Sequence, residues 1–353
     1  MKATMIKAPQ STLTGQIGEE RRRVDFDSYD ITVQQLLSMV SGKQIDVAPT
    51  YQRRFRWDAT RQSQLVESIF LGIPVPNIFM ATNADGTWEV VDGVQRLSTL
   101  VHFAGDEDAR HTLGLDTELV VEGLTKLSGL NGNTFTALPT SVQLQFSLRP
   151  VKVTTLSDKS DLKVRFDLFE RLNTGGVRLS DQEIRGCIYR GSFNDFLERM
   201  AVNEDFKTVV VLRKSDEVDG TREEYVLRFF AFLHGYKQFE HSVVDFLNDY
   251  MAAATNVFDF AAGEREFAHT FAELARLFPS GLHRTKKTTP VNLYEAVSVG
   301  AALALRKQAR LKGAKNPAWI EDAELHEMTT GATNNRKAVV GRIDYAATKF
   351  KTG

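Results

Sequence analysis

The feature that most constrains the fold of this chain is a change of hydrophobic period part-way along the sequence. Before about residue 158, short β-type runs such as NIFMAT, TWEVV and VKVTTL alternate with isolated helical segments. After about Leu162, apolar residues recur at three-to-four spacing in one segment after another. A period of two favours strands and a period near 3.6 favours helices. The sequence therefore predicts an α+β fold in which an all-helical C-terminal domain follows an α/β N-terminal domain.

The chain length supports a division into more than one core, because 353 residues exceed the usual size of a single hydrophobic core. The first residues are polar, carry an RRR run and show no clear period. We expect a flexible arm at residues 1–28, an α/β domain at 29–158 and a helical domain at 159–353.

Charge and cysteine content exclude several classes of protein. The formal net charge is -1, so there is no global basic excess, and any phosphate chemistry must be local. Cys187 is the single cysteine and lies in an apolar helical setting, which excludes an intramolecular disulfide and predicts a core thiol in a reducing compartment. The first residues lack an apolar signal core, and no apolar stretch approaches the roughly 18 residues of a membrane span. These observations predict a cytoplasmic protein without membrane association.

The strongest candidate site is the run VVDGVQRLSTL, in which a strand ends at Asp92 and a helix begins after Gly93. Backbone N–H groups and the positive end of a helix dipole stabilise an anion at such a junction. Arg96 adds a forked guanidinium that matches phosphate oxygens, and Asp92 is placed to hold a metal or orient a water. The alternative is structural, because Asp92 and Gln95 also match a capping box that only satisfies helix N–H groups.

A second candidate is the run TYQRRFRWD, which interleaves arginines with aromatic residues. Guanidinium groups grip phosphate while an aromatic face stacks on a base. The residues expected to bind here are Arg53, Arg56 and Trp57. The alternative is that the aromatic residues belong to the core and the arginines are solvated.

A third candidate is the run FERLNTGGVRLSDQEIR. Asn173, Gly175 and Gly176 account for a turn between two helices, and Ser180 with Glu183 forms a capping box, so this segment needs no function. The functional interpretation is that the arginines of this run, Arg185 among them, face the phosphate site across a cleft between the domains.

A basic stretch in the C-terminal half is the fourth candidate. Between residues 281 and 315, Glu295 is the only acid among many basic side chains. These are His283, Arg284, Lys286, Lys287, Arg306, Lys307, Arg310, Lys312 and Lys315. The stretch is either a patch for the DNA backbone or a solvated helix face. The chain contains no GxxxxGK[ST] phosphate loop, and its histidines are scattered without metal-ligand pairing.

Four runs in this order resemble a known family. PTYQRRFRW, LVESIFLGIPVPNIF, VVDGVQRLSTLVHF and FERLNTGGVRLSDQEIRGCIYRG are similar to the ParB/sulfiredoxin-like domain of GmrSD modification-dependent restriction enzymes and of the SspE phage-defence protein. The resemblance covers roughly residues 30–255. It implies a ParB/sulfiredoxin-like fold for the α/β domain.

The resemblance also implies roles for individual residues. In that family the D-G-x-x-R motif is associated with nucleoside triphosphate hydrolysis or with a ParB-like nuclease-type site, so Asp92, Gln95 and Arg96 become candidate catalytic residues. The remaining motif positions become candidates for nucleotide binding: Gln52, Arg53, Gly93, Asn173, Gly175, Gly176 and Arg185. The implied cofactors are a nucleoside triphosphate such as GTP and a divalent metal such as Mg²⁺, with Asp92 as the metal ligand. The implied partners are DNA, including modified or phage DNA, and a separately encoded nuclease subunit.

Two departures from the family shape the expected function. Val94 stands where the commonest family form has glutamine, and no histidine cluster follows residue 255. We therefore expect a nucleotide-hydrolysing or nucleotide-sensing component of a DNA restriction or phage-defence system that does not cut DNA alone. Two alternatives stay open, a non-catalytic DNA-binding module and a regulatory subunit of a separate nuclease.

Overall fold

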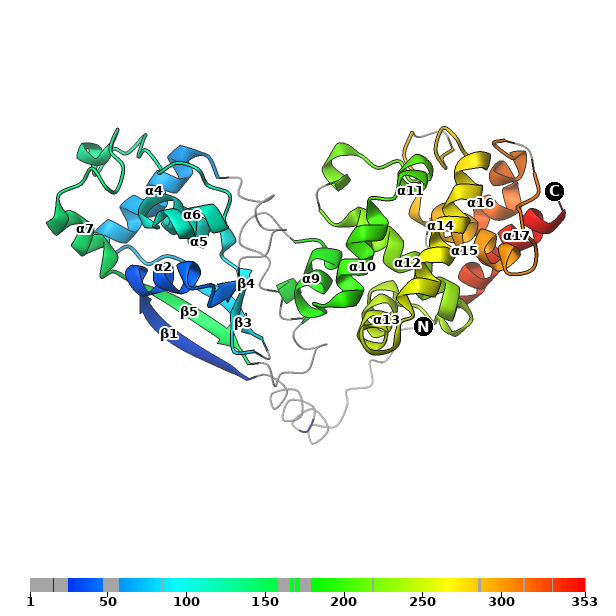
Figure 1. Ribbon diagram of the computed structural model, residues 1–353, viewed down its shortest axis with the longest axis horizontal. Coiled ribbons are helices and arrows are strands. Elements are labelled where there is room, and N and C mark those ends of the chain that lie inside the picture. Colours follow the sequence, from blue (N-terminus) through cyan, green and yellow to red (C-terminus); the bar gives the residue numbers. More distant parts are fainter. Residues whose placement is uncertain are drawn as a thin grey trace, which may run out of the picture. The chain divides into compact units, whose positions relative to one another are not determined.

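The structure is a computed structural model of the chain that divides into two compact units, Met1–Arg178 and Leu179–Gly353 (Figure 1). The predicted boundary at residue 158 borders a stretch outside the described residues, and the division between the units falls within the run FERLNTGGVRLSDQEIR. The described residues are 15, 25–46, 57–83, 85–157, 166–167, 169–171, 179–217, 219–284, 287–313, 315–331 and 333–352.

The N-terminal unit is built on a five-stranded sheet of order β1-β5-β3-β4-β2. β1 pairs with β5 and β3 with β4 in antiparallel orientation, whereas β3 pairs with β5 and β2 with β4 in parallel. The strands are β1 (Phe26–Thr32), β2 (Ile45–Asp46), β3 (Ile78–Thr82), β4 (Trp88–Asp92) and β5 (Pro150–Leu156). The runs NIFMAT, TWEVV and VKVTTL are therefore strands, as predicted.

Helices α2, α4, α5 and α6 lie on one side of this sheet (Figure 1). The helices α4 and α5 contribute Phe70 and Phe103 to an aromatic cluster in which Phe103 contacts Phe70, Phe135 and Phe146, with ring centroids 6.4, 5.4 and 5.0 Å apart. The helices of this unit are α2 (Val33–Ser41), α4 (Ala59–Leu71), α5 (Val94–Ala104), α6 (Glu107–Thr112), η1 (Ser128–Leu130) and α7 (Thr140–Ser147). The run TRQSQLVESIFLG predicts an amphipathic helix closed by glycine, and α4 ends in this way, since Gly72 adopts a left-handed conformation with φ 69°.

Strand β1 (Phe26–Thr32) differs from what the sequence predicts. The polar residues up to 28 indicate an arm, and the run ITVQQLLSMV indicates a helix that starts near Ile31. Five of its seven residues are exposed, so the strand lacks the alternation that marks a half-buried strand. It forms because it pairs with β5, for instance Tyr29 with Val153, and this partner is more than a hundred positions away in the sequence. The helix begins only after Thr32, whose hydroxyl accepts a hydrogen bond from the Gln35 amide.

The C-terminal unit is helical throughout its regular structure, as predicted. α15 is its central helix, with eleven buried residues, and it packs closely on α17. A Cβ placed on Gly300 would lie 2.8 Å from the Ala346 side chain, which shows how near the two helices come. The helices are α9 (Asp181–Ile188), α10 (Ser192–Ala201), α11 (Glu204–Val209), η2 (Lys214–Glu217), α12 (Thr221–Gly235), η3 (Tyr236–Gln238), α13 (Val243–Val257), α14 (Phe260–Leu277), α15 (Val291–Leu305), η4 (Ala318–Glu321), α16 (Ala323–Thr329) and α17 (Arg336–Thr352).

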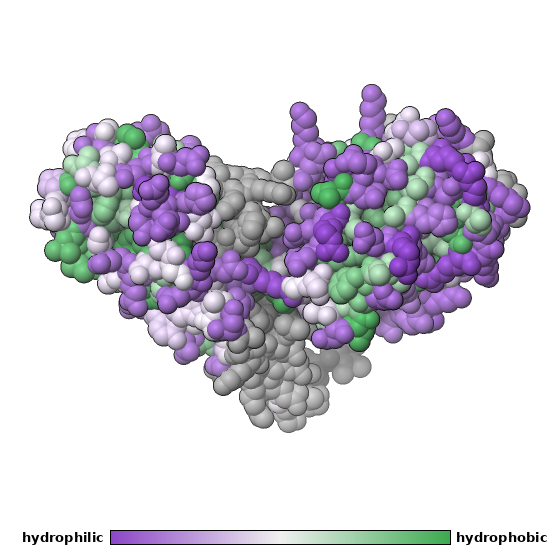
Figure 2. Space-filling view, viewed as in Figure 1, coloured by the Kyte–Doolittle hydropathy of each residue, from purple (hydrophilic) through white to green (hydrophobic). Residues whose placement is uncertain are grey.

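The surface seen in Figure 2 is mainly hydrophilic, and the single cysteine lies in the interior. On the face shown in Figure 2, hydrophilic side chains predominate over both units, and apolar side chains occur in scattered patches. Cys187 is a buried thiol of the helical unit, as predicted. Among the described helices, none is both long enough and apolar enough to cross a membrane.

Candidate functional site

The DGVQR run lies at a strand-to-helix junction, as predicted. β4 ends at Asp92, Gly93 occupies the N-cap position with φ 100°, and α5 begins at Val94. Within the described residues no side chain caps this helix, so the Asp92 and Gln95 side chains do not form the capping box that their spacing also allowed. The first turn of α5 thus presents its N–H groups without a side-chain cap.

Asp92 and Arg96 form an ion pair at this junction, with 2.7 Å between Oδ2 and Nη2. The same Nη2 donates a second hydrogen bond, of 2.9 Å, to the backbone carbonyl of Asn77. Arg96 is 7% exposed, so most of its side chain is buried beside α5. Its buried Nε has no hydrogen-bond partner among the described residues. A buried guanidinium N–H without a partner is costly, which marks this position as one that a ligand or water can satisfy.

Gly93 is required by this arrangement for two reasons. Its positive φ is strained for any residue with a Cβ, and a Cβ there would lie 3.0 Å from Arg96 Nη2 and 3.2 Å from Ile78. We predict that Gly93→Ala lowers the free energy of unfolding by about 1–2 kcal/mol and displaces the Arg96 guanidinium. Urea denaturation of the purified protein measures the loss.

Gly86→Ala is the matched control for this prediction. Gly86 also has a positive φ, of 83°, but nothing lies within 4 Å of its Cβ position. The excess loss of Gly93→Ala over Gly86→Ala therefore reports the contacts with Arg96 and Ile78. Equal losses in the two variants would show that only backbone strain matters at the junction.

The third motif residue, Gln95, connects α5 to the end of the arginine-rich run. Gln95 Oε1 accepts a hydrogen bond of 3.1 Å from the Trp57 amide, and Gln62 Nε2 donates one of 2.8 Å to the Trp57 carbonyl. The Arg61 guanidinium lies over the Trp57 ring, 4.6 Å from its centroid. The residue that follows Arg56 is therefore fixed against the first turn of α5.

Gln62 also contacts His102, a half-buried residue of α5. His102 Nδ1 lies 2.7 Å from Gln62 Oε1. Burial lowers the pKa of His102 below its ordinary value of 6.5, and the charge of Arg110 acts in the same direction. The folded chain therefore holds this proton less tightly than the unfolded chain.

We predict that this histidine makes stability depend on pH. As the pH falls below about 6.5, the unfolded state takes up more protons than the folded state, so the free energy of unfolding decreases. His102→Gln should reduce this loss between pH 7 and pH 5, as measured by urea midpoints at both values. An unchanged pH dependence in the variant would assign the effect to other groups.

Several predicted site residues lie outside the described residues. These are Gln52, Arg53 and Arg56 of the arginine-rich run, and Asn173, Gly175 and Gly176 of the later run. The expected cleft shared by Arg53 and Arg96 thus stays a prediction. The structure does bring Asp92, Gly93, Gln95, Arg96 and Trp57 together in the N-terminal unit.

Arg185, the last predicted residue, belongs to the helical unit and is 1% exposed. Its Nε donates to Asn248 Oδ1 at 2.8 Å, and its Nη1 donates to Gln182 Oε1 at 3.2 Å and Glu224 Oε2 at 2.9 Å. This guanidinium is engaged inside the unit, so the structure gives Arg185 a packing role.

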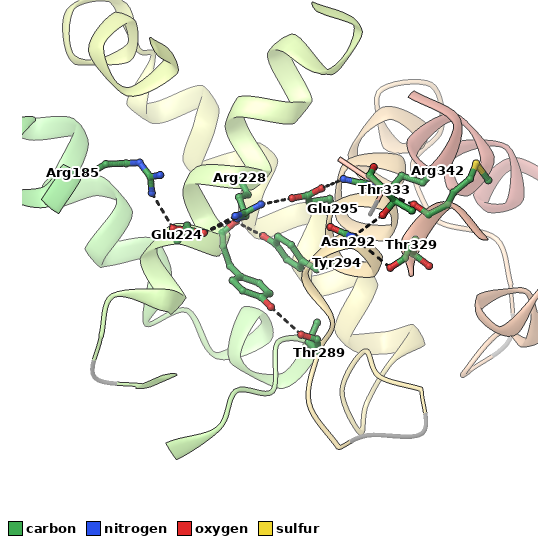
Figure 3. A network of polar contacts seen from close by, with 12 residues as sticks. Arg185, Glu224, Arg228, Thr289, Asn292, Tyr294, Glu295, Thr329, Thr333 and Arg342 are labelled. Carbon is green, nitrogen blue, oxygen red and sulfur yellow. Dashed lines mark hydrogen bonds and ion pairs between the residues drawn. The ribbon is translucent and has the colours of Figure 1, made fainter. Parts of the chain in front are cut away.

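Arg185 is the first member of a chain of alternating charges through the helical unit (Figure 3). Glu224 contacts Arg228 at 2.7 Å, Arg228 contacts Glu295 at 2.6 Å, and Glu295 in turn pairs with Arg342. The chain connects α9, α12, α15 and α17. We call these five residues the charge chain.

The pKa directions of Glu224 and Arg228 show that these two members of the charge chain stay ionised. Burial acts to raise the pKa of Glu224, but the Arg228 and Arg185 guanidiniums outweigh it and hold that pKa below its ordinary value. Burial acts to lower the pKa of Arg228, whereas Glu224 and Glu295 raise it above the ordinary value. A buried group remains charged in this way only when its partners compensate the lost hydration.

The basic stretch at 281–315 offers fewer unpaired cations for DNA phosphates than its composition suggests. Arg284 donates to the Ile320 carbonyl at 2.8 Å and to Thr329 at 2.9 Å, and it is largely buried. Arg306 pairs with Glu266, and Arg310 lies 3.4 Å from Glu273. Lys286 lies outside the described residues. The exposed cations without such pairs are lysines: Lys287, Lys307, Lys312 and Lys315.

The N-terminal unit is thus a sheet-and-helix domain whose strand β4 delivers an Asp-Gly junction to the start of α5. The sequence model of a family described as the N-terminal domain of GmrSD restriction endonuclease matches residues 33–190. This stretch of the chain is therefore similar to the N-terminal domain of GmrSD restriction endonucleases. The match begins at α2 and ends just after α9, so it leaves out β1 and supports the predicted resemblance up to residue 190. Comparisons with curated proteins and with solved structures found no match.

Sequence reasoning missed two kinds of residue at these sites. Asn77 supports Arg96 through its backbone carbonyl, which no side-chain pattern reveals. The charge chain did leave a signal, because Glu295 is the lone acid of the basic stretch, and it is fully buried between two guanidiniums. An isolated acid inside an apolar helix indicates a buried partner.

Proposed function

We propose that this protein is a nucleotide-hydrolysing or nucleotide-sensing component of a DNA restriction or phage-defence system. The similarity of residues 33–190 to the N-terminal domain of GmrSD restriction endonucleases supports a role in a restriction-type system. The phosphate groups of the nucleotide bind at the start of α5, where Arg96 stabilises their charge. Asp92 holds the guanidinium of Arg96 in place, and Gln95 positions the end of the arginine-rich run.

The observation that carries this proposal is the Asp92–Arg96 pair beneath an uncapped helix start. The Asp92 carboxylate orients Arg96 at 2.7 Å, which pre-organises the guanidinium before any ligand arrives. The Arg96 Nε is a donor without a hydrogen-bond partner among the described residues, and Gly93 at the N-cap of α5 supplies no side-chain cap. An anionic group with several oxygens satisfies such donors.

The site also fits a divalent metal that arrives with the nucleotide. Asp92 Oδ2 is engaged by Arg96, which leaves Oδ1 as one ligand atom. The described residues contain no group of three potential metal ligands. Mg²⁺ commonly binds through one or two carboxylates together with substrate phosphates, so Asp92 alone is an adequate protein ligand. When bound, the metal neutralises phosphate charge.

The experiment is a phosphate-release assay on the purified full-length chain with each nucleoside triphosphate and Mg²⁺. We expect release of phosphate and, in parallel, no cleavage of plasmid DNA by the chain alone. Absence of release with every nucleotide and with Mg²⁺ or Mn²⁺ would overturn the hydrolytic function, with Val94 as the first position to restore to glutamine.

A DNA-binding assay distinguishes the proposed function from its main rival, a non-catalytic DNA-binding module. The exposed lysines of the basic stretch favour this rival. Under it, DNA affinity falls steeply with added salt because phosphate contacts release counterions. Salt-dependent DNA binding that is lost in Lys287→Gln with Lys312→Gln, without any nucleotide turnover, would replace the proposal by the rival.

A further inference from the structure

A groove on the helical unit has two adjoining hollows, and the first is lined by aromatic rings. It has a cavity volume of about 240 Å³ and lies among the end of α12, α13 and the start of α14. The ring centroid of His234 lies 5.8 Å from that of Tyr250 and 6.4 Å from that of Phe258. A Cβ on Gly263 would come within 2.5 Å of Phe258, so the glycine lets this ring lie flat on α14.

The polar groups of the first hollow are neutral rings and carboxylates. His234 Nδ1 lies 2.7 Å from the Tyr250 hydroxyl, which fixes both rings. Burial lowers the pKa of His234, and the charge of Arg306 acts in the same direction, whereas the charge of Glu266 acts to raise it. Burial raises the pKa of Tyr250. Both rings are therefore uncharged near neutral pH. Asp259 and Glu266 add hydrogen-bond acceptors to the lining.

The second hollow adjoins the first and is lined by cationic groups. It has a cavity volume of about 360 Å³ and shares Ala262 and Glu266 with the first hollow. Arg306 Nε and Nη2 donate to the two oxygens of Glu266 at 2.6 and 3.2 Å, which orients the guanidinium. Arg265 is exposed and has no ion pair within the described part of the chain. His269 also lines this hollow.

We propose that this groove binds a nucleoside monophosphate unit, with the base among the rings of the first hollow and the phosphate at Arg265 and Arg306. Aromatic faces stack on a base regardless of its identity. Asp259 and Glu266 accept hydrogen bonds from an exocyclic amino group, which favours adenine, guanine and cytosine over uracil. Guanidinium groups match the phosphate oxygens. The shared residues Ala262 and Glu266 lie one turn apart on α14, and this spacing accommodates the sugar between base and phosphate.

This site is separate from the Asp92–Arg96 pair, which lies in the other unit. It accepts the same chemical unit from two sources, a free mononucleotide or the 5′-phosphorylated end of a DNA strand. Comparing the affinities of the groove for a mononucleotide and for a 5′-phosphorylated oligonucleotide distinguishes the two sources.

The test is isothermal titration of the full-length protein with AMP, GMP, CMP, UMP and inorganic phosphate. We expect binding of the three amino-bearing nucleotides, weaker binding of UMP, and no comparable binding of phosphate. Arg265→Gln should weaken nucleotide binding by about tenfold through loss of one charge-assisted contact. Ala253→Trp, at an exposed position of the first hollow, should block it.

Two controls keep this result distinct from the function proposed above. Arg213→Gln, which removes a guanidinium 74% exposed on the same unit, should leave binding unchanged. Arg96→Ala should reduce triphosphate turnover by roughly a hundredfold and yet leave monophosphate binding intact. A 5′-phosphorylated oligonucleotide that binds more tightly than the mononucleotides assigns the groove to strand ends, and the reverse order assigns it to free nucleotides. Nucleotide binding that is absent, is matched by phosphate alone, or survives both groove variants overturns the proposal.

Discussion

Glu295→Gln is expected to lower the free energy of unfolding of the helical unit by about 3–5 kcal/mol. Glu295 is 0% exposed and pairs with Arg228 on one side and Arg342 on the other. Removing its charge leaves two guanidinium groups in the interior with less compensation for their lost hydration, and Arg342 is itself 0% exposed. Urea denaturation followed by circular dichroism and by fluorescence of the buried Trp319 measures the loss.

The control for this prediction is an ion pair on the surface of the same unit. Lys207 and Glu204 lie 3.1 Å apart with side chains 39% and 88% exposed. Glu204→Gln should change stability by roughly 0–1 kcal/mol, because solvent screens this pair. A similar small change in Glu295→Gln would mean that the charge chain does not stabilise the helical core. Replacing Glu295 and Arg342 together by methionine should cost less than the single change, because no unpaired charge remains at that end of the chain.

Arg96→Ala is expected to reduce nucleoside triphosphate turnover by roughly a hundredfold, the effect of losing one charge-assisted contact worth about 3 kcal/mol in the transition state. The ion pair with Asp92 places the guanidinium at the start of α5, where phosphate charge is stabilised. Arg96→Lys should restore only part of the rate, since an ammonium group lacks the forked geometry. Initial rates of phosphate release measure each variant.

Leu97→Ala separates this effect from a loss of folding. Leu97 is the neighbouring residue of α5 and is 0% exposed. Its truncation should cost about 2–5 kcal/mol through a cavity, while turnover per folded molecule changes little. Equal phosphate release by wild type and Arg96→Ala would place the activity at another site or in a contaminant.

Local patterns predicted most of the fold. The strands at 78–82 and 88–92, the glycine stop at Gly72 and the capping box of Ser180 with Glu183 all depend on residues close in sequence. Strand β1 could not be predicted in the same way, because its pairing with β5 spans more than a hundred positions and its side chains are mostly exposed. Such non-local pairing leaves little trace in a local window.

The candidate site was predictable to a similar extent. The spacing of Asp92 and Arg96 along the junction indicated that both residues lie at the start of one helix, and the structure has them in contact. The spacing could not show that Arg96 is buried or that Asn77 supports it, because both facts depend on how β3 packs beside α5. The same limit applies to Arg185, whose charge suggested phosphate and whose partners lie on α12 and α13.

The central claim is that nucleotide phosphate binds where β4 meets α5. A crystal structure of the full-length protein with a non-hydrolysable nucleoside triphosphate and Mg²⁺ tests it most directly. The account predicts phosphate oxygens within hydrogen-bond distance of the Arg96 guanidinium and of the first N–H groups of α5, with the metal on Asp92. A nucleotide bound only elsewhere, with the Asp92–Arg96 pair left as it is, would contradict the claim.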